Sequence, residues 1–415
     1  MTLKISLREL IFSIFIILLP FSLYSDYNLH IDLFSYIDEF LCVICIIYTI
    51  FFSIKKGIKG NELILIILLV ICSALGFAGN LYSKLLNEPI PILVDFICLA
   101  KIFVTFIVYK QVAEYDTKKR LISYLVPFAK LLILSGSFFG FISLFVNIGM
   151  TGKETRYGLP QYNFIFENGS RYGYIIACCL IIIMFTNISK KKLSIYKILT
   201  FFNIIIINKG VVLVIFLSYI ALSILWKYKK NGKLNATNIS IISAIVLAAS
   251  SFQINTYIKN DDSPRMLLIR YGFVTANRYF PLGSGFATYG SDMAAKNYSR
   301  LYYKYGFNKV FGMSPQRGSF LSDGYIGMIF GEFGYIGALI YALMLIFVFI
   351  PINRITIDKG IKILTLSIFI GIVISTFGTA IIKSSIGVFV MCILGMVCGY
   401  DTAYQKNNAS NKNNI

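Results

Sequence analysis

The chain has 415 residues, of which 57% are hydrophobic and only 14% are charged. A soluble domain carries about a quarter charged residues, so this composition excludes a large soluble catalytic domain and indicates a membrane protein with many spans. The net charge of +20 is first an orientation signal, because Lys and Arg concentrate in the cytoplasmic loops of membrane proteins, and no nucleic-acid partner is expected.

Cysteine and histidine offer little chemistry in this sequence. The eight cysteines fall inside apolar runs, where a thiol behaves as a small hydrophobic group, so no disulfide framework is expected. Cys42 and Cys45 form a Cys-x-x-Cys pair without a second pair beside it, and His30 is the only histidine. We therefore expect neither a metal site nor a cofactor.

Twelve apolar runs are candidate membrane spans, since a bilayer core about 30 Å thick needs about 20 residues of helix. The first run follows Lys4 and Arg8 and has no small-residue cleavage site behind it, which predicts a retained anchor with a cytoplasmic N-terminus. The runs cover residues 10–24, 36–52, 63–81, 90–109, 121–148, 174–186, 198–207, 211–226, 239–254, 325–350, 363–382 and 386–398. The fold class predicted is an all-α polytopic membrane protein with about 12 transmembrane helices.

The seventh run, 198–207, is short, and it could either join 211–226 as one broken helix or form a hairpin with it. Joining the two would place the lysine-rich segment 227–233 outside, against the bias of positive charge towards the cytoplasm. The hairpin, with its turn at Asn208-Lys209-Gly210, is therefore predicted, and both termini are expected to be cytoplasmic. Lys209 would then lie below the outer surface and face protein or a watery cavity.

The predicted organisation has four parts. Residues 1–254 hold the first nine spans and a short external loop at 149–172, and residues 255–322 form one long external loop. Residues 323–404 hold the last three spans, and residues 405–415 form a polar cytoplasmic tail.

The two external loops are rich in arginine, although the cytoplasmic loops use mostly lysine. The short loop carries Lys153, Arg156 and Arg171. Arginine presents a planar fork suited to bidentate phosphate contacts. A solvated basic loop, or cations that reach lipid headgroups, would give the same composition. The arginines of the long loop are Arg265, Arg270, Arg278, Arg300 and Arg317.

The long loop is expected to contain short amphipathic helices. Ser263-Pro264 predicts a helix start, with Ser as the cap and Pro at the first helical position, and the helix should end before Pro281. Arg270 and Arg278 would lie on one face of it, at headgroup height. Aromatic residues interleave with Arg300 further on, and they suit either sugar stacking or a membrane interface. These aromatics are Tyr298, Tyr302, Tyr303, Tyr305 and Phe307.

Bond formation outside a cytoplasmic membrane has no ATP to draw on, so the substrate must arrive already activated. A polyprenyl-diphosphate-linked sugar meets this need, and its catalysis requires Arg or Lys groups that neutralise the leaving diphosphate. Asp323 could act as the base for an acceptor hydroxyl, because it precedes the span that starts near Tyr325; it could equally cap that helix. The other acidic candidates are Glu154, Glu167, Asp261, Asp262 and Asp292.

Charges inside the predicted spans are functional candidates by default. Asp95 and Lys101 are six residues apart, about 240° round a helix, so they should not pair with each other. Lys101 and Lys130 could each partner an acid on another helix, reach an interface, or line a path for a lipid diphosphate. Residues 38–39 and Glu332 lie near span ends, where a charged group can reach water at little cost in free energy. Their charges therefore say less about function.

These features together resemble the Wzy-type O-antigen and capsular polysaccharide polymerases, whose superfamily also contains the O-antigen ligases. The layout covers nearly the whole chain, and the motif-like part is confined to residues 265–337. That part reads Arg265, Pro281-Leu-Gly283-Ser-Gly285-Phe, Ser322-Asp323-Gly-Tyr325 and Gly331-Glu332-Phe-Gly334-Tyr-Ile-Gly337.

The resemblance implies a metal-independent membrane glycosyltransferase in the bacterial cytoplasmic membrane. Such an enzyme moves a growing glycan from undecaprenyl diphosphate onto the next lipid-linked repeat unit, on the external face. A chain-length regulator and a flippase are the implied partners. Arg265 matches the arginine before the Pro-Leu-Gly turn, and Arg156 and Arg171 match the basic loop after the fifth span. Lys209 stands where related proteins often carry arginine, so its role is less certain.

Three rivals remain open. A ligase of the same superfamily usually has a histidine just before the tenth span, where this chain has Ser322-Asp323, so polymerase is favoured. A lipid-linked oligosaccharide flippase would concentrate charges in a central cavity and needs no long external loop. A metal-dependent lipid-sugar transferase would use acids in the first external loop, here Asp26 and Asp32, but that loop is too short for a domain.

Overall fold

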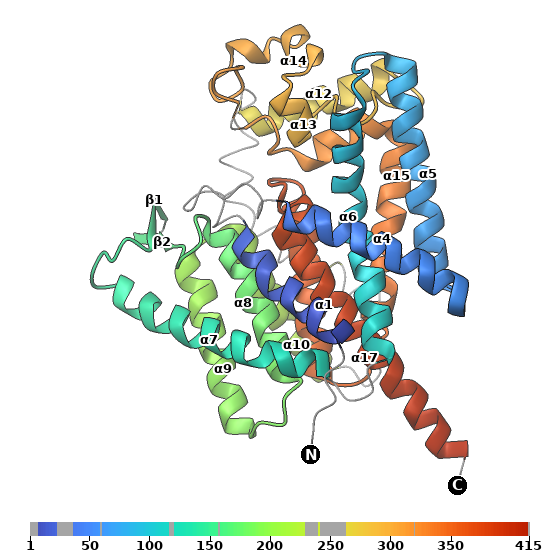
Figure 1. Ribbon diagram of the computed structural model, residues 1–415. Helices are drawn as coiled ribbons and strands as arrows, with labels where there is room; N and C mark the ends of the chain where they lie inside the picture. Colours follow the sequence, from blue (N-terminus) through green and yellow to red (C-terminus); the bar gives the residue numbers. More distant parts are fainter. Residues whose placement is uncertain are drawn as a thin grey trace.

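The computed structural model describes residues 7–22, 36–58, 60–115, 120–156, 158–228, 240, 263–318 and 320–413. Helices dominate this part of the chain (Figure 1). The helices up to the long loop are α1 (Leu7–Leu18), η1 (Leu19–Phe21), α4 (Ile37–Lys56), α5 (Asn61–Ser83), α6 (Pro89–Tyr115), α7 (Arg120–Ser143), α8 (Gly169–Met184), α9 (Lys190–Ile207) and α10 (Gly210–Tyr228). The others are α12 (Pro264–Arg278), α13 (Asp292–Lys296), α14 (Arg300–Lys304), η2 (Phe307–Lys309), α15 (Tyr325–Asn353), α16 (Lys359–Ser375), η3 (Ile381–Lys383) and α17 (Ser385–Asn413).

Within the described residues, seven helices are long and apolar enough to cross a membrane, namely α4, α5, α6, α7, α10, α15 and α17. A helix occupies at least part of every predicted run except 239–254, of which the structure describes residue 240 alone. Helix α8 is apolar but shorter. The chain is therefore a helical membrane protein.

Helices α9 and α10 are separate, as the charge argument predicted. Helix α9 ends at Ile207, and Asn208 adopts a left-handed conformation with φ of 53°. Asn tolerates this conformation better than most residues, so it ends the helix. Helix α9 begins at Lys190, which makes it longer than the apolar run alone suggested.

One small departure from an all-helical chain lies in the short loop predicted at 149–172. Strands β1 (Thr151–Arg156) and β2 (Leu159–Tyr162) form an antiparallel hairpin there. Tyr162 is buried and its hydroxyl donates to the Gly136 carbonyl in α7 at 2.9 Å. The hairpin is thus tied to the helical body just before α8 begins.

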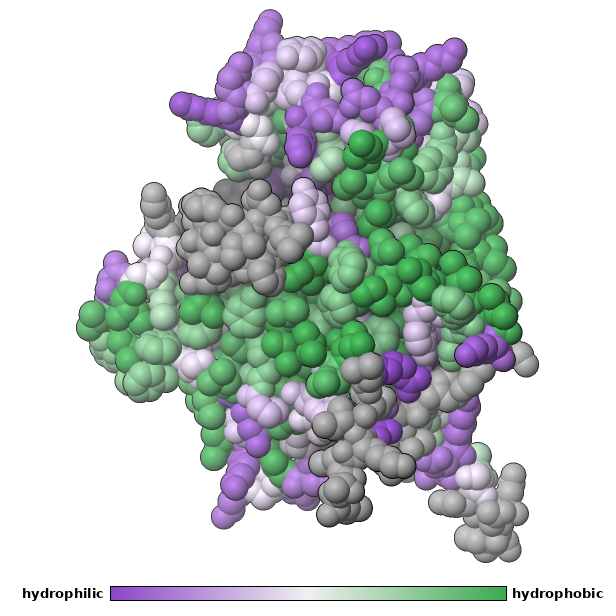
Figure 2. All heavy atoms as spheres, viewed as in Figure 1, coloured by the Kyte–Doolittle hydropathy of each residue, from purple (hydrophilic) through white to green (hydrophobic). Residues whose placement is uncertain are grey.

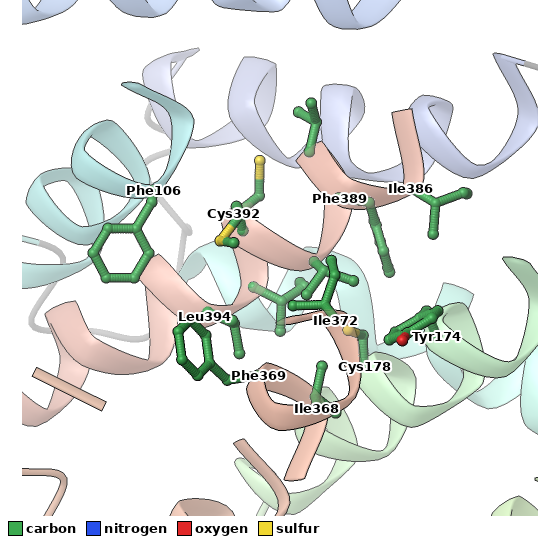
Figure 3. Close-up of a cluster of buried hydrophobic side chains, with 14 of the residues drawn as sticks. Phe106, Tyr174, Cys178, Ile368, Phe369, Ile372, Ile386, Phe389, Cys392 and Leu394 are labelled. Atoms are coloured by element: carbon green, nitrogen blue, oxygen red, sulfur yellow. The ribbon is translucent and has the colours of Figure 1, made fainter. Parts of the chain in front are cut away.

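The helical body is held by a large apolar core in which α17 packs along α6, and α10 packs along α16. Figure 3 shows one part of this core, where α6, α8, α16 and α17 interlock through Phe106, Cys178, Phe369 and Phe389. The eight cysteines are all in the described part of the chain and are free. Apolar surface gathers in a broad band across the middle of the molecule (Figure 2).

The segment with α12, α13 and α14, described at residues 263–318 and 320–322, lies at one end of the molecule and is called the end lobe. The far end of α17 lies at the opposite end (Figure 1). Hydrophilic residues cover the end lobe on the face shown in Figure 2. It has an apolar core of its own, formed around Leu268, Tyr289, Tyr302 and Phe307. Helix α12 starts as predicted, since the Ser263 side chain accepts from the Met266 N–H and Pro264 is the first helical residue.

Two motif-like segments of the sequence meet where the end lobe contacts α15. Gly283 and Gly334 have φ of 81° and 63°, which favours glycine. A Cβ on Gly283 would lie 2.4 Å from the Gly334 nitrogen, so only glycine allows this approach. The backbone N–H groups of Ser284 and Gly285 donate to the carbonyls of residues 331 and 332. The glycine pattern therefore reflects a close backbone contact that breaks the regular course of α15.

Candidate functional site

A polar cavity of about 440 Å³ lies between the helical body and the end lobe. Segments far apart in the sequence line it: the first turns of α4 and α8, the middle of α6, the starts of α12 and α13, residues 322–323, and residues 379–385. Its charged residues are Asp38, Glu39, Lys101, Arg171, Arg265, Asp292, Asp323 and Lys383.

Several helices present their N-terminal ends to this cavity. Arg265 is the second residue of α12, Asp292 and Ser385 are the first residues of α13 and α17, and Asn168 caps α8. The N-terminal end of a helix carries a partial positive charge and unpaired N–H groups, so it favours anions. The cavity thus adds backbone polarity to four cationic side chains.

Arg265 and Asp323 face each other across the cavity. Arg265 Nη2 lies 3.3 Å from Asp323 Oδ2, and the two side chains are 27% and 32% exposed. This contact is weaker than the two parallel hydrogen bonds that an arginine fork can make to an anion, so an anionic ligand in the cavity can compete for Arg265. Burial raises the pKa of Asp323 above its usual range, although the Arg265 charge lowers it.

Arg171 enters the cavity from the first turn of α8. Its Nη1 lies 3.5 Å from Glu167 Oε2, and its side chain is half-buried. Asn168 caps this helix by accepting from the Ser170 N–H at 2.9 Å, which fixes where α8 starts. The turn and its cap set the position from which Arg171 reaches the cavity.

Lys383 and Asp292 form the second ion pair beside Asp323. Lys383 Nζ lies 3.1 Å from Asp292 Oδ2, and only 5% of the lysine side chain is exposed. Partial removal from water tends to raise the pKa of Asp292. The positive charge of Lys383 outweighs this effect and lowers the pKa below the usual value. The two carboxyl groups of Asp292 and Asp323 therefore differ in proton affinity within one cavity.

Lys101 forms a buried ion cluster with α4 at the floor of the cavity. Its Nζ lies 2.5 Å from Asp38 Oδ2 and 2.7 Å from Glu39 Oε1, and Lys101 and Asp38 are 3% and 4% exposed. Pairing of Lys101 with acids on another helix was one predicted outcome and is confirmed. The expectation that Asp38 reaches water near the end of its span is wrong, because packing of α4 against α6 buries its side chain.

Lys101→Met is expected to lower the free energy of unfolding by about 3–5 kcal/mol, because it leaves the Asp38 and Glu39 carboxylates buried without their cation. Stability of the purified protein in detergent would be measured by denaturant titration. Lys309→Met, at an exposed position, is the control and should change stability by less than about 0.5 kcal/mol. Equal stability of the two variants would show that the cluster contributes nothing.

A second set of buried acids fixes the loop that leads into α13. Glu332 Oε1 accepts from the N–H groups of Thr288 and Tyr289 at 3.1 Å and from the Ser291 hydroxyl at 2.9 Å. Asp95 Oδ2 accepts from the Ala287 N–H at 2.7 Å. Both acids are buried, so the view of Glu332 as an easily solvated span end is wrong. Its bond to Ser291, the cap of α13, helps place the next residue, Asp292.

Glu332→Leu is expected to loosen residues 284–291, because three donors lose their acceptor at about 1–3 kcal/mol each. Hydrogen exchange followed by mass spectrometry should show faster exchange in this segment than in the parent protein. Glu332→Gln keeps one carbonyl oxygen as acceptor and should show a smaller change. Unchanged protection in the leucine variant would contradict the role given to Glu332.

The structure brings together three of the predicted site residues, Arg171, Arg265 and Asp323, and leaves others outside the cavity lining. Arg270, Arg278 and Arg300 are exposed on α12 and α14. The Arg278 guanidinium lies 6.0 Å from the centre of the Tyr279 ring. Lys209 lies at the turn between α9 and α10, away from this lining.

Some predicted residues have no described side chain. Arg156 ends β1, but its side chain lies outside the described part, as do those of Lys153 and Glu154. The pair at 261–262 and the residues at 26, 30 and 32 also lie outside it.

The aromatic run 298–307 is mainly structural. Tyr302 and Phe307 are buried in the core of the end lobe and stack with ring centres 5.6 Å apart. Tyr305 stacks on Tyr271 of α12 at 4.6 Å, whereas Tyr303 is exposed. Packing of the lobe thus accounts for most of these rings without a sugar.

Sequence reasoning missed Lys383 as a site residue and gave Asp292 no special place among the acids. Their pairing depends on the contact between the end lobe and the segment before α17, for which no local spacing gives a signal. Neither a protein-family model nor a curated protein matches this sequence.

Proposed function

We propose that this protein is a glycosyltransferase that joins polyprenyl-diphosphate-linked oligosaccharide repeat units into a polysaccharide. The observation that carries the proposal is the single cavity in which Arg171, Arg265 and Asp323 meet, beside several helix N-termini. In this proposal the end lobe belongs to an external loop at 255–322, the chain crosses the bacterial cytoplasmic membrane about twelve times, and both termini are cytoplasmic.

The diphosphate of the donor binds between Arg171 and Arg265. Arg171 lies 3.5 Å from the Glu167 carboxylate, and Arg265 lies 3.3 Å from the Asp323 carboxylate. A diphosphate offers more acceptor oxygens than one carboxylate, so it competes with the carboxylates for both guanidinium groups. Because Arg265 then turns from Asp323 to the phosphate, the Asp323 carboxylate becomes available to the acceptor.

The transfer step uses Asp323 as base and the arginines as the anion clamp. The acceptor hydroxyl oxygen attacks the anomeric carbon of the donor glycan, and Asp323 takes the hydroxyl proton. The bond between that carbon and the phosphate oxygen breaks, and undecaprenyl diphosphate leaves with the electron pair. Arg171 and Arg265 stabilise its growing negative charge. The burial that raises the pKa of Asp323 makes it a stronger base than an ordinary aspartate.

In this proposal the reaction requires no nucleotide, because the donor is already activated, and no metal, because the arginines stabilise the leaving diphosphate. Donor and acceptor are both lipid-linked, and the membrane lipid surrounds them. A flippase that delivers repeat units and a regulator of chain length are the partners that the reaction calls for.

The test is the length of the glycan on its lipid carrier and at the cell surface after loss of the protein. Loss of a polymerase leaves single repeat units. Loss of an O-antigen ligase, the alternative within the same superfamily, leaves long chains on undecaprenyl diphosphate. Loss of a flippase, the alternative from another class, traps units on the cytoplasmic side. Either of the latter results would overturn the proposal.

A further inference from the structure

A second hollow, of about 460 Å³, lies in the apolar part of the molecule next to the polar cavity. Its lining comes from residues of α15 between Tyr325 and Leu345, from Val373 near the end of α16, and from Thr376 and Phe377 just after that helix. The lining is almost entirely apolar and includes the small residues Ala338 and Ala342. We call this hollow the α15/α16 groove.

The α15/α16 groove and the polar cavity meet at two chain segments. Asp323 lines the cavity and Tyr325 the groove, and likewise Thr379 lines the cavity and Phe377 the groove. The Ile326 N–H donates to the Thr376 carbonyl at 3.3 Å and holds the two segments side by side.

Gly378 stands at the junction, between Phe377 of the groove and Thr379 of the cavity. A Cβ added to Gly378 would meet no atom within 4 Å. Open space therefore lies in front of this glycine, at the place where the polar and apolar hollows adjoin.

We infer that the α15/α16 groove holds the isoprenoid chain of a lipid whose diphosphate occupies the polar cavity. This inference rests on the proposed function and extends it to the lipid part of the substrate. An isoprenoid chain needs apolar contact and no polar partner, and this lining provides only such contact. Tyr325 and Tyr341 lie on the two parts of α15 that the break at Gly334 separates, and their rings, 5.7 Å apart, both line the groove.

The groove and the polar cavity are lined by neighbouring residues on two chain segments, and this closeness favours one occupant over others. A phospholipid acyl chain or a second copy of this protein could cover apolar surface anywhere on the membrane face. Only a lipid with a strongly anionic headgroup uses the groove and the arginine-lined cavity at the same time.

The test is binding of inorganic diphosphate, geranyl diphosphate and farnesyl diphosphate to the purified full-length protein in nanodiscs, with empty nanodiscs as the blank. For the parent protein the affinity should increase from inorganic to farnesyl diphosphate. Ala342→Trp fills the groove and should lower the affinity for farnesyl diphosphate about tenfold. It should leave the affinity for inorganic diphosphate unchanged.

Two further variants keep this result specific. Gly378→Leu places a side chain in the open junction and should likewise weaken farnesyl diphosphate more than inorganic diphosphate. Ile346→Trp enlarges an exposed apolar residue of the same helix outside the groove and should behave as the parent protein. Because Ala342 and Gly378 are not packed tightly, both variants should insert and remain monodisperse.

An affinity that does not increase with the prenyl chain, or an increase that survives Ala342→Trp, overturns the inference. Ala342→Trp that changes only the oligomeric state overturns it in favour of a second copy. These results are independent of the proposed function, since inorganic diphosphate reports on the polar cavity alone. Chain-dependent binding in a protein whose loss leaves polymer length normal would refute the polymerase and support the groove.

Discussion

Arg265→Ala is expected to leave the protein inserted in the membrane and to slow polymer growth by about 10²–10³-fold, the loss typical of one preorganised donor at a developing anion. Arg265 is the second residue of α12, and its guanidinium faces Asp323 in the cavity at 3.3 Å. Glycan length on the lipid carrier would be compared in cells that carry each variant at equal membrane abundance. Single repeat units should accumulate.

Arg171→Ala should have the same phenotype, because its guanidinium enters the cavity from α8. Arg265→Lys keeps the charge but loses the fork, so it should retain part of the activity. Arg317→Ala is the matched control, since this arginine of the same lobe is exposed and lies outside the cavity lining. Normal polymer from both Arg171→Ala and Arg265→Ala would refute the diphosphate clamp.

Asp323→Asn is expected to lower the rate of chain growth by about 10²–10⁴-fold, which is the usual contribution of a positioned base. The amide has nearly the same size but cannot accept the hydroxyl proton. Affinity for inorganic diphosphate should be kept or increased, because Arg265 loses a competing carboxylate. This combination separates a base from a residue that only positions Arg265.

The pH dependence of chain growth follows from the same carboxyl group. The working form of Asp323 is the ionised one, so activity is present above its pKa and is lost as the pH falls through it. Burial raises this pKa, so the acidic limb should lie above the value of about 3.9 for an ordinary aspartate. The limb would be measured with membranes and a lipid-linked substrate over a pH series.

Asp292 offers an internal comparison for that profile. The Lys383 charge lowers its pKa, so Asp292 stays ionised over the range in which Asp323 takes up a proton. Asp292→Asn should therefore leave the position of the acidic limb unchanged, even where it lowers the rate. A limb at the pH of an ordinary aspartate, or one that moves with Asp292→Asn, would contradict the assignment of Asp323.

Much of the helical architecture follows from local patterns in the sequence. Apolar runs predict helices because the bilayer core leaves backbone groups no partner except each other. Ser263-Pro264 predicts the start of α12, and Asn208-Lys209 predicts the break between α9 and α10, because caps and left-handed turns depend on a few adjacent residues. The seven long apolar helices within the described residues agree with the composition.

The sequence predicts individual candidate residues of the site, but it does not predict which of them meet in one cavity. Arg171, Arg265 and Asp323 stand out because arginine and an acid occur in loops beside predicted spans, yet Arg270, Arg278 and Arg300 stand out equally and are exposed on the lobe. Which arginine reaches the cavity depends on the side of α12 that packs against α15.

The sequence by itself determined that this is a helical membrane protein, where several helices start, and that its loops carry arginine. The tertiary structure alone decided that Lys101 pairs with α4, that Glu332 holds the loop before α13, and that Lys383 meets Asp292. The physical reason is the sequence separation of the residues that interact. Helix formation and capping act over a few residues, whereas these contacts join segments between about 40 and 90 positions apart, and only packing of the helices selects them.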